Sequence, residues 1–262
     1  KSQGAVPGIQ LAHAGRKAST GRPWAGHDPL QPDDGGWEVL APSDDPWPYE
    51  GHDAPPTRAM DRNDIEDVIE AFRAGAERAL DAGFEVAEVH GAHGYLLHEF
   101  LSPVTNHRDD EYGGSFENRA RLVREVTAAV REVWPDDKPV FVRLSGTDWI
   151  DEEASWTVEQ SARLADVLRE AGADLIDVSS GGIAPHSSPD WAGPNYQLAL
   201  AEHVRENAAS DIAVGTVGGI TTAEQSEAIV RNDRADLVIV GREFLRHPYF
   251  GLHAADKLGA DV

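Results

Sequence analysis

Short apolar runs alternate with amphipathic helical stretches along almost the whole chain. The runs are rich in β-branched residues and lie at 8–12, 86–90, 139–145, 175–179, 212–217 and 237–241. The helical stretches are marked by apolar residues at helical spacing or by a capping-box pattern, at 65–79, at 122–133, at Thr157 with Gln160, and at Thr221 with Glu224. Strands that alternate with helices predict a parallel α/β sheet, which we expect to be covered by helices on both faces.

The number of runs constrains the fold further. Six runs are present, whereas a (β/α)₈ TIM barrel needs eight strands. In such barrels a phosphate group commonly binds to the loops after strands 7 and 8. The last two runs end in Gly218-Gly219 and in Gly241-Arg242, which suit that position. We therefore predict a single domain over 1–262, a (β/α)₈ barrel with strands 3 to 8 present and strands 1 and 2 missing.

Composition excludes several classes of site. The 262 residues include no cysteine, so disulfides, thiolate zinc sites and iron–sulfur clusters are ruled out. No apolar run approaches the roughly 20 residues that span a bilayer, and no signal peptide opens the chain. We expect a cytoplasmic enzyme without a membrane partner.

The charge is strongly acidic. There are 46 acidic residues against 23 basic ones, giving a net charge of −23, and lysine is rare. Such a surface disfavours nucleic acid and anionic membranes as partners. Because the acidic residues are spread over every segment, the pattern is typical of a halophilic protein that relies on salt to screen self-repulsion.

One segment, 89–119, carries most of the candidate chemistry. It places His90, His93 and Tyr95 within six residues of a strand-to-loop junction. Two imidazoles and a phenol offer hydrogen-bond donors and a proton donor, which suits polarising a carbonyl and protonating the adjacent carbon. Two other interpretations stay open from these residues alone. The pair can be a metal chelate with His98 or Glu99 as a third ligand, or both histidines can be structural.

The same segment closely resembles the active-site block of the old yellow enzymes, the FMN-dependent ene-reductases, and in particular their thermophilic-like branch. Residues 8–16 resemble the third-strand motif of that family. The resemblance implies that His90 and His93 bind the carbonyl of an electron-poor alkene and that Tyr95 donates the proton. It also implies FMN as cofactor, NAD(P)H as reductant, a small-molecule alkene as substrate, and no metal.

The resemblance also assigns cofactor contacts. Gln10 matches a glutamine that hydrogen-bonds the flavin pyrimidine ring, and Arg143 matches an arginine near flavin N1 and O2. The phosphate cradle corresponds to Gly218, Gly219, Gly241 and Arg242, where glycine backbone and a guanidinium suit an anion. Ser179 and Gly181 can face the same pocket, although turn chemistry explains both equally well.

The segment before the first predicted helix and the missing strands lead to two further expectations. The long segment 20–60, rich in proline, glycine and tryptophan, is predicted to be an ordered loop over the barrel mouth. A barrel without two strands is expected to form a homo-oligomer or to pair with a complementing chain.

Two alternative functions remain: a non-redox phosphate-binding barrel enzyme, and a barrel fragment that is not catalytic and binds no flavin.

Overall fold

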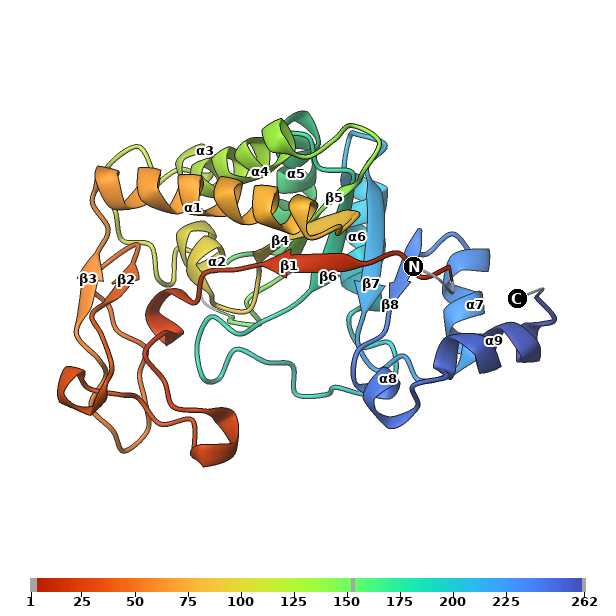
Figure 1. The fold of residues 1–262 in the computed structure, drawn as a ribbon, viewed down its shortest axis with the longest axis horizontal. Coiled ribbons are helices and arrows are strands. Elements are labelled where there is room, and N and C mark those ends of the chain that lie inside the picture. Colours follow the sequence, from red (N-terminus) through yellow and green to blue (C-terminus); the bar gives the residue numbers. More distant parts are fainter. Residues whose placement is uncertain (1–3, 152–153, 261–262) are drawn as a thin grey trace.

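The computed structural model describes residues 4–151 and 154–260. Its main element is a six-stranded sheet in the order β1-β4-β5-β6-β7-β8, and every neighbouring pair is parallel. The strands are β1 (Gly8–Leu11), β4 (Val86–Gly91), β5 (Val140–Ser145), β6 (Leu175–Ser179), β7 (Ala213–Val217) and β8 (Leu237–Ile239). Each of the six predicted runs coincides with one of them, and only β4 extends beyond its run, by the one residue Gly91. In Figure 1, β1 lies across the view and β7 runs nearly vertically, so the sheet curls into part of a barrel.

Helices connect successive strands of this sheet. The connecting helices are α1 (Arg62–Asp81), α4 (Arg121–Val133), α5 (Val158–Glu170), α6 (Leu198–Asn207) and α7 (Ala223–Arg231). Shorter helices lie in the loops or after β8, namely α2 (Leu96–Leu101), α3 (Phe116–Arg119), α8 (Arg242–Arg246) and α9 (Phe250–Leu258). In the described parts of the chain, no helix combines the length and apolar character needed to cross a bilayer.

The prediction that helices cover both faces of the sheet is wrong. Along β1, β4 and β5 the exposure of the side chains alternates, so the two faces differ. Val89, Val142 and Val178 belong to the core that packs against the helices. Residues of the opposite register position, such as Glu88 and Arg143, face the inside of the curl. Polar residues at every second position are therefore accommodated because the sheet encloses a lumen on that side.

One of the two predicted N-cap positions is correct, and the other is wrong by one residue. Thr157 caps α5 as expected, with its side chain accepting from the amide of Gln160. The capping box of α7 uses Thr222 with Gln225, where Thr221 with Glu224 was predicted. Thr222 is the cap because its Oγ1 accepts from the Gln225 amide at 3.2 Å, while the Gln225 side chain accepts from the Thr222 amide at 3.1 Å.

The segment 20–60 holds regular structure of its own. It contains β2 (Val39–Ala41) and β3 (Thr57–Ala59), which form a separate parallel pair, and short 3-10 helices at Pro23–Ala25 and Pro32–Asp34. In Figure 1 these elements lie apart from the main sheet, beside the end of β1 that leads into the loops.

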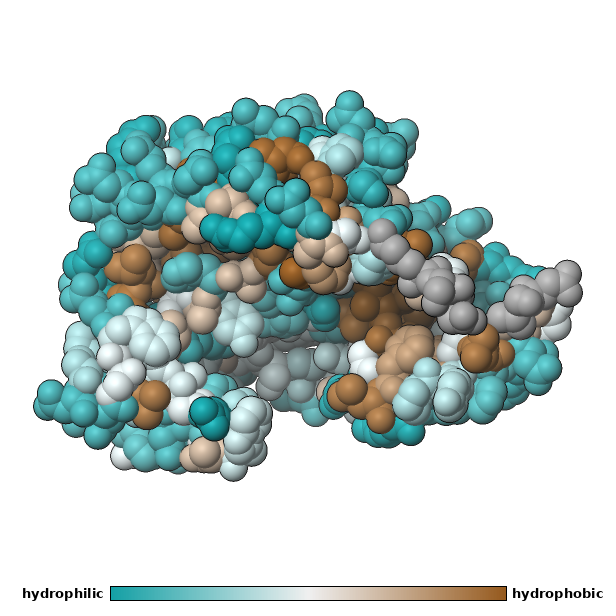
Figure 2. Space-filling model, viewed as in Figure 1, coloured by the Kyte–Doolittle hydropathy of each residue, from teal (hydrophilic) through white to brown (hydrophobic). Residues whose placement is uncertain are grey.

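Within the described residues, β1 and β8 are the two edges of the sheet and do not pair with each other. Val6 and Leu237 expose 62% and 37% of their surface near these edges. Figure 2 shows hydrophobic side chains gathered around the part of the molecule that holds β8, α8 and α9. The described structure is thus a half-barrel with an open side. How many strands would close it stays a prediction.

Candidate active site

The three predicted catalytic side chains lie together at the carboxyl end of β4. His90 is the fifth residue of that strand, His93 lies in the turn that follows, and Tyr95 is the N-cap residue of α2. The ring centroids of His90 and His93 are 5.1 Å apart, and those of His90 and Tyr95 are 5.3 Å apart. The turn reverses direction sharply, which is why residues three apart can face one another here although they could not within a strand.

That turn has an unusual backbone. His93 and Gly94 both have positive φ, at 59° and 65°. A Cβ on Gly94 would lie 2.0 Å from the carbonyl oxygen of Gly182, so only glycine fits at this position. The amide of His93 donates to Ser145 Oγ at 2.9 Å, which helps to fix the left-handed conformation.

Both imidazoles are neutral at neutral pH. Burial and, to a smaller extent, the nearby charge of Arg143 lower the pKa of His90 to about 4 and that of His93 to about 3. A neutral imidazole donates one N–H and accepts at its other nitrogen. His93 Nδ1 lies 3.4 Å from His90 Nε2, and His93 Nε2 lies 2.7 Å from Ser179 Oγ, so Ser179 takes part in setting the tautomer of His93.

A cavity of about 390 Å³ extends from His93 along the carboxyl edge of the sheet. Most of the predicted cofactor residues line it, together with Ser179: Arg143, Gly218, Gly219, Gly241 and Arg242. Gly218 and Gly219 have positive φ of 117° and 65°. A Cβ on Gly218 would lie 2.7 Å from the Tyr196 ring and one on Gly219 would lie 2.3 Å from the Gly193 carbonyl oxygen, so only glycine fits at these two positions. Gly241, in contrast, has open space around it.

Two predicted residues lie elsewhere. Gln10 lines a second cavity of about 380 Å³ in the lumen, which shares Arg143 and Ile239 with the first. Its Nε2 donates to Glu88 Oε2 at 2.6 Å. Gly181 does not line either cavity; its amide donates to the carbonyl oxygen of Thr147.

Arg143 has a protein partner that the sequence did not reveal. Asp177, directly opposite it on β6, places Oδ2 at 3.3 Å from Arg143 Nε. The Asp177 side chain is fully buried, and burial raises the pKa of its carboxyl well above the usual range. The neighbouring Glu88 raises that pKa further, whereas Arg143 opposes the shift. Arg143 is therefore held over an acidic pair on the lumen face.

Lys17 also lies at the site, although the sequence analysis did not predict it. Its Nζ donates to the carbonyl oxygens of His93 and Gly182 at 2.8 and 2.5 Å, and burial lowers its pKa to about 8. It also lies 4.1 Å from the ring centroid of Trp47 and 5.4 Å from that of Tyr95. Trp47 thereby connects the segment 20–60 to the site. A lysine soon after a strand, in Gly15–Lys17, was the available signal.

The metal interpretation of the histidine pair lacks its third ligand. His98 contacts Asp148 and the amide of Gly94, and the Glu99 carboxylate accepts from the amide of Arg16. Within the two described ranges, no group of three or more histidine, aspartate or glutamate side chains is arranged to hold a metal ion.

Comparison with known proteins places this geometry in context. The model of the NADH:flavin oxidoreductase / NADH oxidase family matches residues 1–260. A NADPH dehydrogenase of Geobacillus sp. is 47% identical over 262 residues, which are 100% of this chain and 69% of that protein. A NADH:flavin oxidoreductase of Gibberella zeae is 44% identical over 273 residues, with 100% of this chain and 65% of that protein covered. The chain thus spans about two thirds of the length of these curated relatives.

Solved structures agree with the sequence matches. Morphinone reductase superposes with a TM-score of 0.75 at 28% identity, over 100% of this chain and 67% of its own. A 2-naphthoyl-CoA reductase in complex with 2-naphthoyl-CoA superposes with a TM-score of 0.81 at 28% identity, over 99% of this chain and 39% of its own. The half-barrel seen here therefore corresponds to part of larger chains.

Proposed function

The chain belongs to the NADH:flavin oxidoreductase / NADH oxidase family, and from this we propose an FMN-dependent enzyme that uses NAD(P)H to reduce activated C=C bonds. The family resemblance predicted from 89–119, that of the old yellow enzymes, is confirmed by these matches. The proposed substrates are enones and related electron-poor alkenes.

The observation that carries the proposal is that His93, whose ring centroid lies 5.1 Å from that of His90, lines the same cavity as the glycine backbone. His93 lines one end of the cavity, and Gly218, Gly219 and Arg242 line the other. The residues present fit FMN, because Gly218 and Gly219 line the cavity with backbone that carries no side chain, in a positive-φ conformation that suits binding of a phosphate group. Arg242 adds a guanidinium at that end.

The remaining proposed cofactor contacts come from two residues on the lumen face of the sheet, Arg143 and Gln10. Arg143 lines both cavities and lies between His93 and Gln10, where its charge favours an electron-rich ring. Gln10 is oriented by Glu88 and offers an amide to the same ring. When bound, FMN supplies the hydride chemistry that no side chain here can provide.

The side chains supply polarisation and a proton. Each neutral imidazole of His90 and His93 can donate one N–H to a carbonyl oxygen, and two such donors draw electron density from the conjugated double bond. Tyr95 lies beside His90 and carries a phenolic proton for the carbon next to the carbonyl. The protein thus orients and polarises the alkene.

The open side of the half-barrel leads to a related proposal. We propose that two further strands pair with β1 and β8, supplied by a longer form of the chain or by a second chain. Unpaired edges of a parallel sheet leave amide and carbonyl groups without partners and expose apolar side chains, as seen at Val6 and Leu237.

Titration with FMN tests the cofactor assignment. The purified protein should quench flavin fluorescence and shift the visible flavin bands, and NADPH should bleach the bound flavin under anaerobic conditions. Arg242→Ala should weaken FMN binding, while Arg231→Ala, an exposed arginine on α7, should leave it unchanged. Unaltered flavin spectra at saturating FMN would instead favour a non-redox barrel or a non-catalytic fragment.

A further inference from the structure

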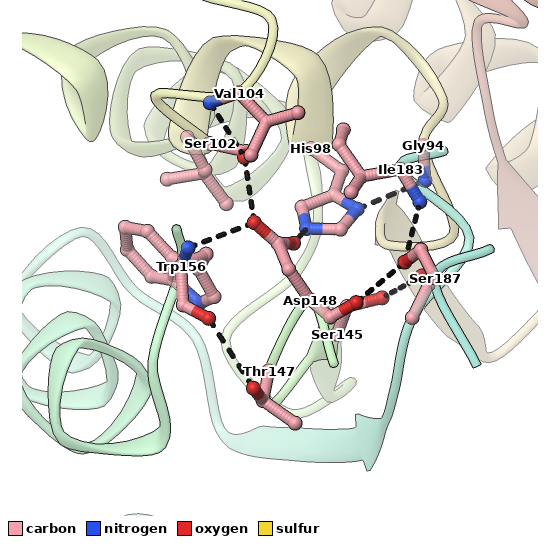
Figure 3. Close-up of polar contacts among 12 residues, drawn as sticks. Gly94, His98, Ser102, Val104, Ser145, Thr147, Asp148, Trp156, Ile183 and Ser187 are labelled. Carbon is pink, nitrogen blue, oxygen red and sulfur yellow. Dashed lines mark hydrogen bonds and ion pairs between the residues drawn. The ribbon is translucent and has the colours of Figure 1, made fainter. Parts of the chain in front are cut away.

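A fully buried polar cluster contacts Gly94, the residue between His93 and Tyr95 (Figure 3). At its centre are His98 of α2 and Asp148 of the loop after β5, both 0% exposed, with His98 Nε2 at 3.0 Å from Asp148 Oδ1. The second carboxylate oxygen accepts from Ser102 Oγ and from the amide of Trp156, each at 2.7 Å. A buried carboxylate with this many donors is fixed in place.

His98 also contacts the turn itself. The amide of Gly94 donates to His98 Nδ1 at 2.9 Å (Figure 3). Gly94 lies between His93 and Tyr95, and both it and His93 have positive φ. A non-glycine residue in this conformation is strained and persists only where its surroundings hold it. The bond to His98 is one of the contacts that hold it.

The two contacts of His98 determine its tautomer. Because Nδ1 accepts from the Gly94 amide, a neutral His98 carries its proton on Nε2, which faces Asp148. A carboxylate next to one ring nitrogen is the usual device for fixing which nitrogen is protonated. Asp148 therefore keeps Nδ1 available as the acceptor for the turn.

The cluster reaches a second loop that packs on the turn. The carbonyl oxygen of Asp148 accepts from Ser187 Oγ at 2.6 Å, and Ser187 Oγ accepts from the amide of Ile183. The amide of Gly182 donates to the Ser187 carbonyl oxygen, and the Gly182 backbone packs directly on His93 and Gly94. Asp148 thus connects the loops after β4, β5 and β6.

We propose that His98 is a positioning residue, which holds the His93–Tyr95 turn in its reactive conformation without touching substrate, and that Asp148 acts through His98 by keeping Nδ1 available as the acceptor. This inference rests on the proposed function of His93 and Tyr95. If the cluster served only to anchor α2, loss of either His98 contact would have the same effect on the turn.

Two isosteric replacements separate these cases. In His98→Asn, the side-chain oxygen can take the place of Nδ1 and accept from Gly94, while the contact with Asp148 is lost. In His98→Gln, the amide nitrogen can take the place of Nε2 and reach Asp148, while the contact with Gly94 is lost. Each variant keeps one of the two His98 contacts. Their melting temperatures therefore control for a general loss of stability.

Two measurements are compared across the variants. The first is hydrogen exchange of the Gly94 amide, which needs no cofactor. The second is the affinity of the FMN-loaded protein for a small phenol, read from its charge-transfer absorbance. In His98→Gln we expect exchange about tenfold faster and binding about tenfold weaker, as for one lost hydrogen bond near the ligand. In His98→Asn both should stay within about threefold of the unmodified protein.

Equal changes in the two variants would overturn the positioning role. The exchange measurement is independent of the proposed function, so absence of phenol or FMN binding would contradict the function and leave the exchange comparison decisive. The ¹⁵N spectrum of the unmodified protein gives a check that needs no variant: His98 should be protonated on Nε2 only. A proton on Nδ1 would contradict the inference.

Discussion

Burial beside a guanidinium determines the chemistry of His90 and His93. The two imidazoles stay uncharged at neutral pH because desolvation and Arg143 both oppose protonation. In the proposed function, these uncharged donors polarise a carbonyl without forming a permanent ion pair with substrate, and Tyr95 is the proposed proton donor.

Replacement of both histidines tests their role. His90→Ala with His93→Ala should abolish binding of small phenols and enones to the oxidised, FMN-loaded protein, with a loss of about 2–4 kcal/mol typical of oxyanion-type donors. Flavin content should remain, since the cradle residues are untouched. The matched control replaces His247 and His253, which contact each other on the surface. A charge-transfer band that persists in the site variant would contradict the assignment.

The lowered pKa values also predict a pH dependence of stability. An unfolded histidine takes up a proton near pH 6.5, whereas His90 and His93 do so only near 4 and 3. Between these values the unfolded chain binds more protons, so the free energy of unfolding should fall as the pH decreases from 6.5 to 4. Urea unfolding at several pH values should show a shallower decline in the double alanine variant. Parallel profiles would show that these two groups do not contribute.

The catalytic residues that the sequence predicts are those of one local motif. His90, His93 and Tyr95 lie within one turn, so their proximity is encoded in six residues. Glu88 and Asp177 were missed because their roles depend on strand register, and Lys17 was missed because it contacts loops that are far from it in the sequence. Arg143 faces Asp177 only through the pairing of β5 with β6, which no local pattern reports.

At the scale of elements, the six strands were predictable because each is a short apolar run bounded by turn residues. The three-residue strands β2 and β3 were not, since so few residues carry no periodic signal. The expectation that helices cover both faces of the sheet is wrong because the strands are not continuously apolar. The polar residue at every second position, as in Glu88 and Arg143, was the signal for a lumen.

The cap of α7 gives a prediction at this scale. Thr222→Ala should lower the free energy of unfolding by about 1 kcal/mol, because it removes the side-chain acceptor for the Gln225 amide. Thr221→Ala should have a smaller effect, since Thr221 lies one residue before the cap. Denaturant unfolding of both variants measures the difference. A larger loss for Thr221→Ala would show that the cap is assigned to the wrong threonine.

For the whole molecule, net charge is the dominant surface property. With a formal charge of −23, repulsion between carboxylates opposes the compact state wherever salt does not screen it. At 0.01 M salt the screening length is about 30 Å, comparable to the size of the domain. The melting temperature should therefore rise steeply from dilute buffer to molar KCl. A flat profile would contradict the halophilic interpretation.

Anaerobic stopped-flow absorbance follows the two half-reactions of the FMN-loaded protein separately and tests the proposed ene-reductase function. NADPH should bleach the flavin bands, and an enone such as 2-cyclohexenone should restore them with one equivalent of saturated ketone. In Tyr95→Phe, restoration by the enone should be slower by about 10²-fold or more, while bleaching by NADPH should barely change, because only the second step needs the phenolic proton. Equal slowing of both steps, or flavin that NADPH bleaches and no enone restores, would contradict the account.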